Sequence, residues 1–130
     1  TPQPNFEKAY NYVKQDMDNK VIIDGFPSTA RLYLGKVDYG LKFSLSGMEN
    51  NETSDVYTGI PYIDINTLKN TKACYLIIDK LAYRRIAPEI KEFIDKMTLV
   101  EEASEDKDAY SGIMVYKCKS IFPKIRNYRL

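Results

Sequence analysis

Apolar residues along this chain recur at two spacings, one typical of helices and one typical of strands. Residues 6–17 and 88–97 place apolar side chains three and four positions apart, which predicts two helices that each bury one face. Residues 30–34 predict a shorter helix, closed by a glycine, and residues 66–68 predict a single turn. The residues expected to begin these four segments are Asn5, Pro88, Ser28 or Thr29, and Asn66.

Strands are predicted where short apolar runs lie between turn residues. The runs at 21–23 and 73–78 are continuously apolar, as in strands that are buried on both faces of a parallel sheet. Residues 37–45 alternate instead, which predicts a strand with one buried face. The other predicted strands are residues 60–63, 98–100 and 113–118. Because helices alternate with these strands, we expect an α/β fold, a three-layer Rossmann-like domain with a mostly parallel sheet and a possible antiparallel C-terminal edge.

The length of the chain fits a single domain. A chain of 130 residues has enough apolar material for one hydrophobic core but not for two. We expect the α/β domain to span residues 1–118 and a basic tail to follow at residues 119–130. Because the sequence opens on Thr1 without a methionine, we expect a domain cut from a longer protein. Its longest apolar runs are far shorter than the ~20 residues that cross a bilayer.

Composition and charge remove several classes of function. Nineteen basic residues nearly balance 18 acidic ones, and a net charge of +1 gives no electrostatic basis for binding nucleic acid. The chain has no histidine, which excludes Ser-His-Asp and Cys-His catalysis and histidine-ligated metal sites. No pattern points to a metal ion or a cofactor, so neither is expected.

Two cysteines and one sequon complete the composition. Cys74 and Cys118 lie in apolar strand-like runs without the paired spacing of a metal site, and we expect both to be buried thiols. Asn51 begins an Asn-Glu-Thr glycosylation sequon, whose use the sequence leaves open.

Two carboxylates, Asp24 and Asp79, follow the strands predicted at residues 21–23 and 73–78. Ligands of open parallel sheets bind beyond the carboxyl ends of the strands, so these side chains are a candidate acid/base pair. The alternative is that they cap helices or accept hydrogen bonds in turns. The turn after Asp24 lacks the glycine pattern of a phosphate-binding loop.

Four basic residues could surround the same edge of the sheet: Arg31, Lys36, Arg84 and Arg85. Their positive charge would suit an anionic lipid-linked donor or a membrane head group. The alternative is that they are ordinary solvated side chains.

Four segments together carry a family resemblance: TARLYLGKVDYGL, DVYTGIPYID, IIDKLAYRRIAPEIKEFI and GIMVYKC. In this order they resemble the extracytoplasmic C-terminal domain of polytopic membrane glycosyltransferases of the GT-C class, in particular the protein O-mannosyltransferase-like family. The resemblance covers residues 6–118, although its motifs are less specific than a metal-ligand pattern.

The resemblance implies a parent enzyme that transfers a sugar from a dolichyl- or polyprenyl-phosphate donor to an acceptor at the outer face of the membrane. In that family the catalytic carboxylate lies in an early loop between transmembrane helices, and no position here corresponds to it. The domain would then be non-catalytic and would assist acceptor recognition, stability or assembly. Its implied partners are the transmembrane part of the parent protein, a lipid-linked sugar, and a protein or glycan acceptor.

The likeness is carried by residues that we take as a candidate ligand or acceptor face: Arg31, Tyr33, Lys36, Asp38, Tyr39, Asp55, Tyr57 and Gly59. The alternative is that these residues fix strand ends and chain reversals. A different function class is also open, a stand-alone Rossmann-like module that binds a small ligand or a protein partner. An independent enzyme would instead need a pocket in which Asp24 or Asp79 has a strongly shifted pKa.

Overall fold

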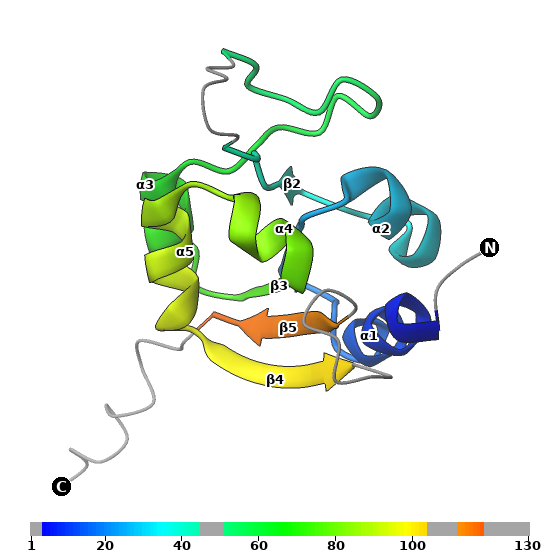
Figure 1. Ribbon diagram of the computed structural model, residues 1–130. Coiled ribbons are helices and arrows are strands. Elements are labelled where there is room, and N and C mark those ends of the chain that lie inside the picture. The colour runs from blue at the N-terminus through cyan, green and yellow to red at the C-terminus, as the bar shows by residue number, and fades with distance from the viewer. Residues whose placement is uncertain (1–3, 45–50, 104–111, 119–130) are drawn as a thin grey trace, which may run out of the picture.

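A computed structural model describes residues 4–44, 51–103 and 112–118 of the chain. Within these residues helices and strands alternate through most of the sequence (Figure 1). In chain order they are α1 (Pro4–Lys14), β1 (Val21–Asp24), α2 (Pro27–Leu34), β2 (Tyr39–Gly40), α3 (Ile65–Asn70), β3 (Cys74–Asp79), α4 (Lys80–Arg85), α5 (Pro88–Asp95), β4 (Thr98–Ala103) and β5 (Ile113–Lys117).

The strands form one mixed sheet in the order β2-β1-β3-β5-β4. β1 is parallel to both β2 and β3, with Asp24 opposite Gly40 on one side and Ile77 on the other. β5 is antiparallel to β3 and to β4. The predicted α/β class and the antiparallel pair at the C-terminal edge are therefore confirmed, whereas the sheet is parallel only on the β2 side.

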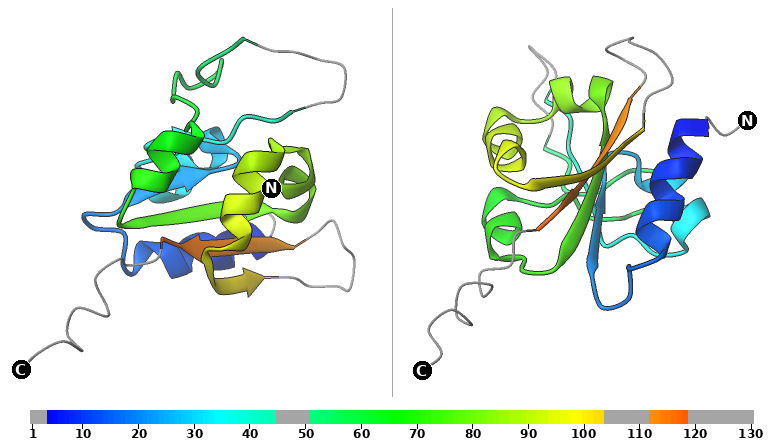
Figure 2. Two further views of the ribbon diagram at one scale, coloured as in Figure 1. Left: turned by 90° about the vertical axis from the view of Figure 1, so that its left-hand side faces the viewer. Right: turned by 90° about the horizontal axis from the view of Figure 1, so that it is seen from below.

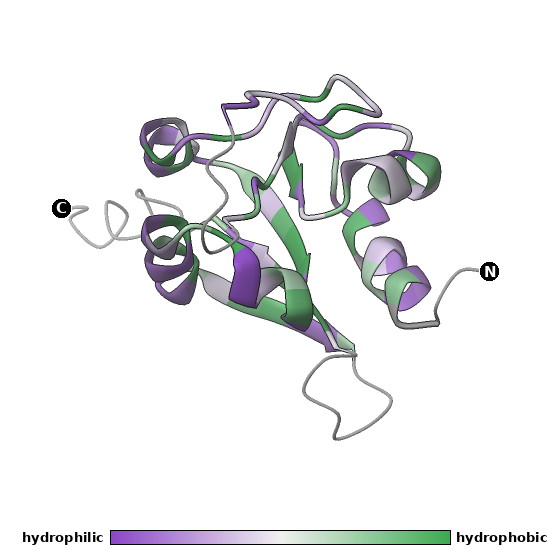
Figure 3. Cartoon of the chain, turned by 45° about the horizontal axis from the view of Figure 1, so that its top comes forward, coloured by the Kyte–Doolittle hydropathy of each residue, from purple (hydrophilic) through white to green (hydrophobic). Residues whose placement is uncertain are grey.

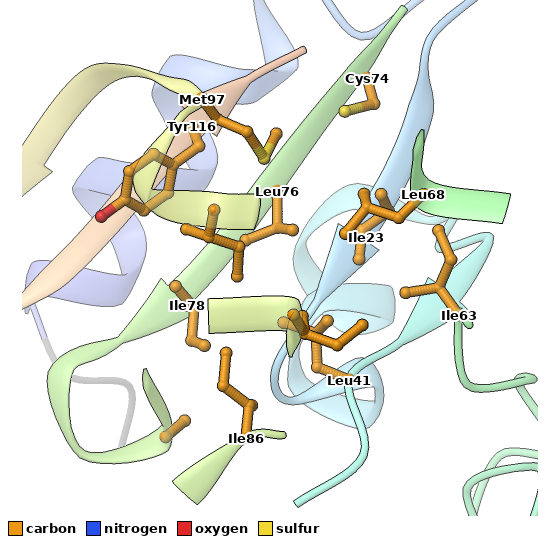
Figure 4. Close-up of a cluster of buried hydrophobic side chains, with 13 residues drawn as sticks. Ile23, Leu41, Ile63, Leu68, Cys74, Leu76, Ile78, Ile86, Met97 and Tyr116 are labelled. Carbon is orange, nitrogen blue, oxygen red and sulfur yellow. The ribbon is translucent and has the colours of Figure 1, made fainter. Parts of the chain in front are cut away.

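Helices cover both faces of this sheet (Figure 2), and each face has its own hydrophobic core. The side chains of Ile23, Leu76 and Ile78 belong to the first core, with residues of α3, α4 and α5 (Figure 4). Those of Ile22 and Ile77 belong to the second core, with residues of α1 and α2. β1 and β3 read as continuously apolar because successive side chains point to opposite faces and both faces are covered.

The crossovers on either side of β1 use different faces of the sheet. The chain goes from β1 to β2 through α2, which packs on the second core, and from β2 to β3 through α3, which packs on the first. Since the two connections move in opposite directions from β1, the strand order reverses between β1 and β3. This reversal is the place where open α/β sheets bind ligands, beyond the carboxyl ends of the strands.

Two predicted strands are largely absent from the sheet. Residues 37–45 pair only at Tyr39 and Gly40, and Phe43 makes an isolated bridge to Ile86 outside the sheet. Leu41 and Phe43 nevertheless pack on the first core, so the alternation reflects burial on one side and not strand pairing. Residues 60–63 make only isolated bridges, one of them from Tyr62 to Gly40.

α5 begins at Pro88 as predicted, but the other predicted helix starts differ from the structure. α1 begins at Pro4 and α2 at Pro27, and proline suits the first helical position because its nitrogen carries no hydrogen to satisfy. The residue before α2, Phe26, makes no side-chain cap hydrogen bond. α3 is capped by Asp64, whose Oδ1 accepts from the Thr67 N–H at 2.7 Å. α4 was not predicted, because its six residues are too short for a periodic pattern.

A disulfide joins Cys74 to Cys118, so the prediction of two free buried thiols is wrong. Tyr75 pairs with Lys117 in the register of β3 and β5, which places the two cysteines opposite each other with their Cα atoms 5.1 Å apart. The antiparallel register that creates this pair was not evident from the spacing of the two cysteines.

The surface of the helices is mixed in polarity, while the central strands are mostly hydrophobic (Figure 3). In the described part of the chain no helix is both long enough and apolar enough to cross a bilayer. The predicted basic tail lies outside the described residues.

Candidate functional site at the carboxyl edge of the sheet

Asp24 and Asp79 lie at the neighbouring carboxyl ends of β1 and β3, as predicted. Asp24 is in register with Ile77, so Asp79 stands two residues farther along the adjacent strand. The Gly25 N–H donates to the Ile77 carbonyl at 2.9 Å, which continues the strand pairing just past Asp24. The fold therefore brings both carboxylates to the point where the strand order reverses.

The Asp24 carboxylate is enclosed, with only 1% of its surface exposed. Its Oδ2 accepts a hydrogen bond from the Tyr10 hydroxyl at 3.0 Å, and its Oδ1 accepts one from the Phe26 N–H at 2.6 Å. Burial raises the pKa of Asp24 well above the usual carboxyl range, and the charge of Asp79 adds to this rise, against the opposing effect of the two hydrogen bonds. Both oxygens are thus engaged inside the fold.

Asp79 is half-buried and begins α4. Its Oδ1 accepts from the Ala82 N–H at 2.6 Å, which is the hydrogen bond of a helix N-cap. Burial raises its pKa, while the cap hydrogen bond and the charge of Arg85 lower it. The alternative interpretation, a turn acceptor at Asp24 and a helix cap at Asp79, describes the hydrogen bonds that both side chains make.

Tyr10 is part of this arrangement and was not singled out from the sequence. Its ring stacks on Tyr33 at 4.9 Å between centroids, and its hydroxyl reaches Asp24 from α1. Burial, and next the charge of Asp24, raise its pKa above the ordinary tyrosine value. The only signal in the sequence was a tyrosine on the apolar face of the first helix, which normally marks a core residue.

Three of the four predicted basic residues lie in the last turns of helices, whereas Lys36 follows α2 and reaches the start of β1. The Lys36 ammonium donates to the Lys20 carbonyl at 2.8 Å, just before β1 begins, so the expectation that it surrounds the carboxyl edge is wrong. Arg31 is exposed in the last turn of α2. Arg84 and Arg85 are exposed in the last turn of α4.

Asp38 and Tyr39 hold β2 against β1. The Asp38 Oδ2 accepts from the Ile22 N–H at 2.8 Å, and its own N–H donates to the Ile22 carbonyl at 2.9 Å. Tyr39 is opposite Ile23 in the register and packs on the first core. Both residues therefore fix a strand end, as the alternative interpretation held.

Asp55 and Gly59 build a tight chain reversal. Thr58 donates to the Asp55 Oδ2 from its N–H at 2.9 Å and from its hydroxyl at 2.7 Å. Gly59 has a φ of +72°, a conformation that favours glycine. The Asp55 N–H donates to the Ile60 carbonyl at 2.8 Å and closes the turn.

The tip of this turn exposes two apolar residues, Val56 at 66% and Tyr57 at 87%. Burial of Ile60 and Ile63 anchors the second arm of the turn beside β2, where the Ile63 N–H donates to the Gly40 carbonyl at 3.0 Å. We call residues 54–61 the tip hairpin. Tyr57 is thus a large side chain of the candidate acceptor face that is both exposed and held on a hydrogen-bonded turn.

The candidate residues do not form one continuous site. Asp24 and Asp79 meet at the carboxyl edge, Lys36 and Asp38 lie near the start of β1, and Tyr57 lies at the tip hairpin. Among the described residues no cluster of cysteine, aspartate and glutamate has the arrangement of a metal site. Comparisons of the chain with protein-family models, with curated proteins and with solved structures found no match.

Proposed function

We propose that this chain is a non-catalytic extracytoplasmic domain of a membrane glycosyltransferase that uses a polyprenyl-phosphate sugar donor. The proposal that the domain is non-catalytic rests on the enclosure of Asp24 and on the role of Asp79 as a helix cap. A general acid or base must reach the substrate, and a carboxylate that is 1% exposed and bonded through both oxygens does not. What remains for the domain is contact with the parent enzyme or its acceptor.

The disulfide supports a location outside the cytoplasm. Disulfides persist in oxidising compartments and are rare in the cytosol, where thiols are kept reduced. The Cys74–Cys118 bond joins the central strand of the sheet to the residue that follows β5. It therefore favours the outer face of the membrane, as the family resemblance implies.

The tip hairpin supports a contact role. Its hydrogen-bonded turn holds Val56 and Tyr57 in solvent, although burying two apolar side chains would be favourable. Tyrosine offers a large rigid contact surface at a low cost in side-chain entropy and is frequent in interfaces. We propose that this hairpin touches the transmembrane part of the parent enzyme.

The arrangement of helices supports the finer description of the fold. Helices cover both faces of the sheet, and the strand order reverses next to β1. These two features are those of a three-layer Rossmann-like domain, which we propose here with an antiparallel addition formed by β5 and β4.

The first test is the coding sequence upstream of Thr1. If this proposal holds, it encodes several apolar segments of membrane-spanning length, and membranes containing the full protein transfer a sugar from a dolichyl- or polyprenyl-phosphate donor to an acceptor. The isolated 130-residue chain should transfer none. An upstream sequence without any such segment would overturn the proposal.

A stand-alone binding module is the second candidate, and the cavities favour it. One cavity of about 340 Å³ and another of about 370 Å³ fall within the size range of small-molecule sites. A start codon directly before Thr1, together with saturable binding of a small ligand by the isolated chain, would establish this function in place of the first.

A further inference from the structure

The cavity of about 340 Å³ lies away from the carboxyl edge, at the opposite end of β3. It is bounded by the last residues of α3, the connection from α3 to β3, and the end of α5. Neither Asp24 nor Asp79 lines it. The cavity also differs from the tip hairpin, so any ligand it binds would act at a separate place on the molecule.

The inner part of this cavity is apolar. Phe93 and Met97 line it from α5 and the residue stretch after it, and both pack on the first core. Cys118, one of the two disulfide cysteines, also lines it. Met97 and Cys74 are seen within the same buried cluster in Figure 4. An apolar ligand group placed here would continue the packing of the core.

Its rim is positively charged. Three lysines line the cavity, Lys69, Lys72 and Lys96, and no acidic residue does. Glu92 comes within 3.9 Å of the Lys96 ammonium, but both side chains are more than two-thirds exposed, at 76% and 72%, and water screens such a pair strongly.

Helix ends explain only part of this charge. Lys69 lies in the last turn of α3 and Lys96 caps the end of α5, so both complement the negative ends of helix dipoles. Each helix end carries at most roughly half a negative charge, which is less than the charge of one lysine. Lys69 and Lys96 therefore keep positive charge at the rim of the cavity.

We propose that this cavity binds an amphiphile with one anionic head group, its apolar part against Phe93 and Met97 and its head group between Lys69 and Lys96. A neutral apolar molecule would make no use of the charge of Lys69 and Lys96, and a free small anion would make no contact with the apolar wall. This proposal does not depend on the glycosyltransferase function, because it rests on the cavity alone.

The test uses octyl phosphate and the 130-residue chain, in titration calorimetry below the critical micelle concentration. Octyl phosphate should bind saturably with one molecule per chain, and more weakly as salt is added. Octyl glucoside, which has the same tail and no charge, and inorganic phosphate, which has no tail, should each bind at least about tenfold more weakly.

Variants at the rim separate this cavity from nonspecific adsorption. Lys69→Gln with Lys96→Gln should weaken octyl phosphate binding about tenfold, because two charge-assisted contacts are lost. Lys69→Arg with Lys96→Arg should retain binding, and so should Lys14→Gln, which removes an exposed lysine from α1. Circular dichroism should show the same fold in every variant, since the exchanged side chains are on the surface.

The outcomes that would overturn the proposal are specific. Equal binding of octyl glucoside would show that the charged rim plays no part, and equal binding of inorganic phosphate would show the same for the apolar wall. Unchanged binding by the Lys69→Gln, Lys96→Gln variant would place the amphiphile elsewhere. An upstream coding sequence without membrane-spanning segments would contradict the proposed function, but it would not affect the binding of octyl phosphate to this cavity.

Discussion

At the residue scale, Asp24 is a carboxylate that is buried although carboxylates favour contact with water. A carboxylate that is 1% exposed is costly unless hydrogen bonds compensate it, and Tyr10 and Phe26 supply two of them. The hydrogen bond from Phe26 holds the turn that leads into α2, and the one from Tyr10 ties α1 to the sheet. Asp24 therefore joins two helices to one strand end, a structural role that explains its burial without catalysis.

The raised pKa of Asp24 predicts how stability changes with pH. Because the pKa is higher in the folded state than in the unfolded chain, the folded state binds the proton more tightly, and this contribution is complete at a pH below the ordinary carboxyl range. It is lost as the pH rises through the raised pKa. We expect Asp24→Asn to remove that loss, with a gain at neutral pH of about 1 kcal/mol for each unit of the shift.

Urea unfolding between pH 4 and 8 would measure this effect. The asparagine keeps an oxygen that can accept the hydrogen bond from Phe26. Asp18→Asn, at an exposed position, serves as the matched control and should follow the pH dependence of the unchanged chain. A variant at Asp24 that is less stable than the parent at every pH would contradict the prediction.

At the element scale, β3 connects the whole sheet. It pairs with β1 in parallel and with β5 in antiparallel orientation, and its side chains contribute to both cores. The disulfide at its first residue fixes the end of β5 against it. β5 in turn is the only partner of β4 in the described sheet, so the bond also stabilises the position of that edge strand.

Removing the disulfide should lower the stability of the domain. Cys74 and Cys118 are 44 positions apart. A disulfide across a loop of this length restricts the unfolded chain and so stabilises the folded state by about 2–4 kcal/mol. We expect Cys74→Ser with Cys118→Ser to lose that amount in urea unfolding. The parent chain treated with dithiothreitol should lose a similar amount, while the double variant should be insensitive to the reductant. Equal stability of oxidised and reduced parent would contradict this expectation.

At the scale of the whole molecule, the features that matter lie in three separate places. The carboxyl edge holds the enclosed Asp24, the far end of β3 holds the cavity with lysines on its rim, and the tip hairpin extends beside β2. The last two combine exposed groups with apolar surface that a partner or ligand could cover. The proposed contact role therefore belongs to the hairpin, and the proposed amphiphile site to the cavity.

If the chain belongs to a membrane glycosyltransferase, as proposed, Val56→Ser with Tyr57→Ser in the full-length protein should lower the rate of sugar transfer. Loss of an interface anchor typically costs more than about 1 kcal/mol, or roughly fivefold in rate if the contact orders the active enzyme. Thermal unfolding of the isolated domain should be unchanged, because both side chains are exposed. Leu99→Thr, at an exposed apolar position on β4, is the control and should leave the rate unchanged. Equal rates for the two variants would contradict the contact role.

Local patterns were sufficient for most elements of this fold. The periodicity of residues 6–17 and 88–97 located α1 and α5, and the apolar runs at 21–23 and 73–78 located β1 and β3. The neighbouring positions of Asp24 and Asp79 also followed, because parallel strands place their carboxyl ends at one edge. These features depend on short-range spacing, which the amino-acid sequence displays directly.

The tertiary structure alone decided what depends on contacts between distant segments. The disulfide required the antiparallel register of β3 and β5, and the enclosure of Asp24 required Tyr10 from a helix fourteen residues earlier. β2 ends at Gly40, which forms an isolated bridge with Tyr62. The Lys36 ammonium is held by the Lys20 carbonyl. Such pairings involve residues that are far apart in the chain, so no local pattern of apolar and polar positions specifies them, whereas the order of helices and strands is specified by that pattern.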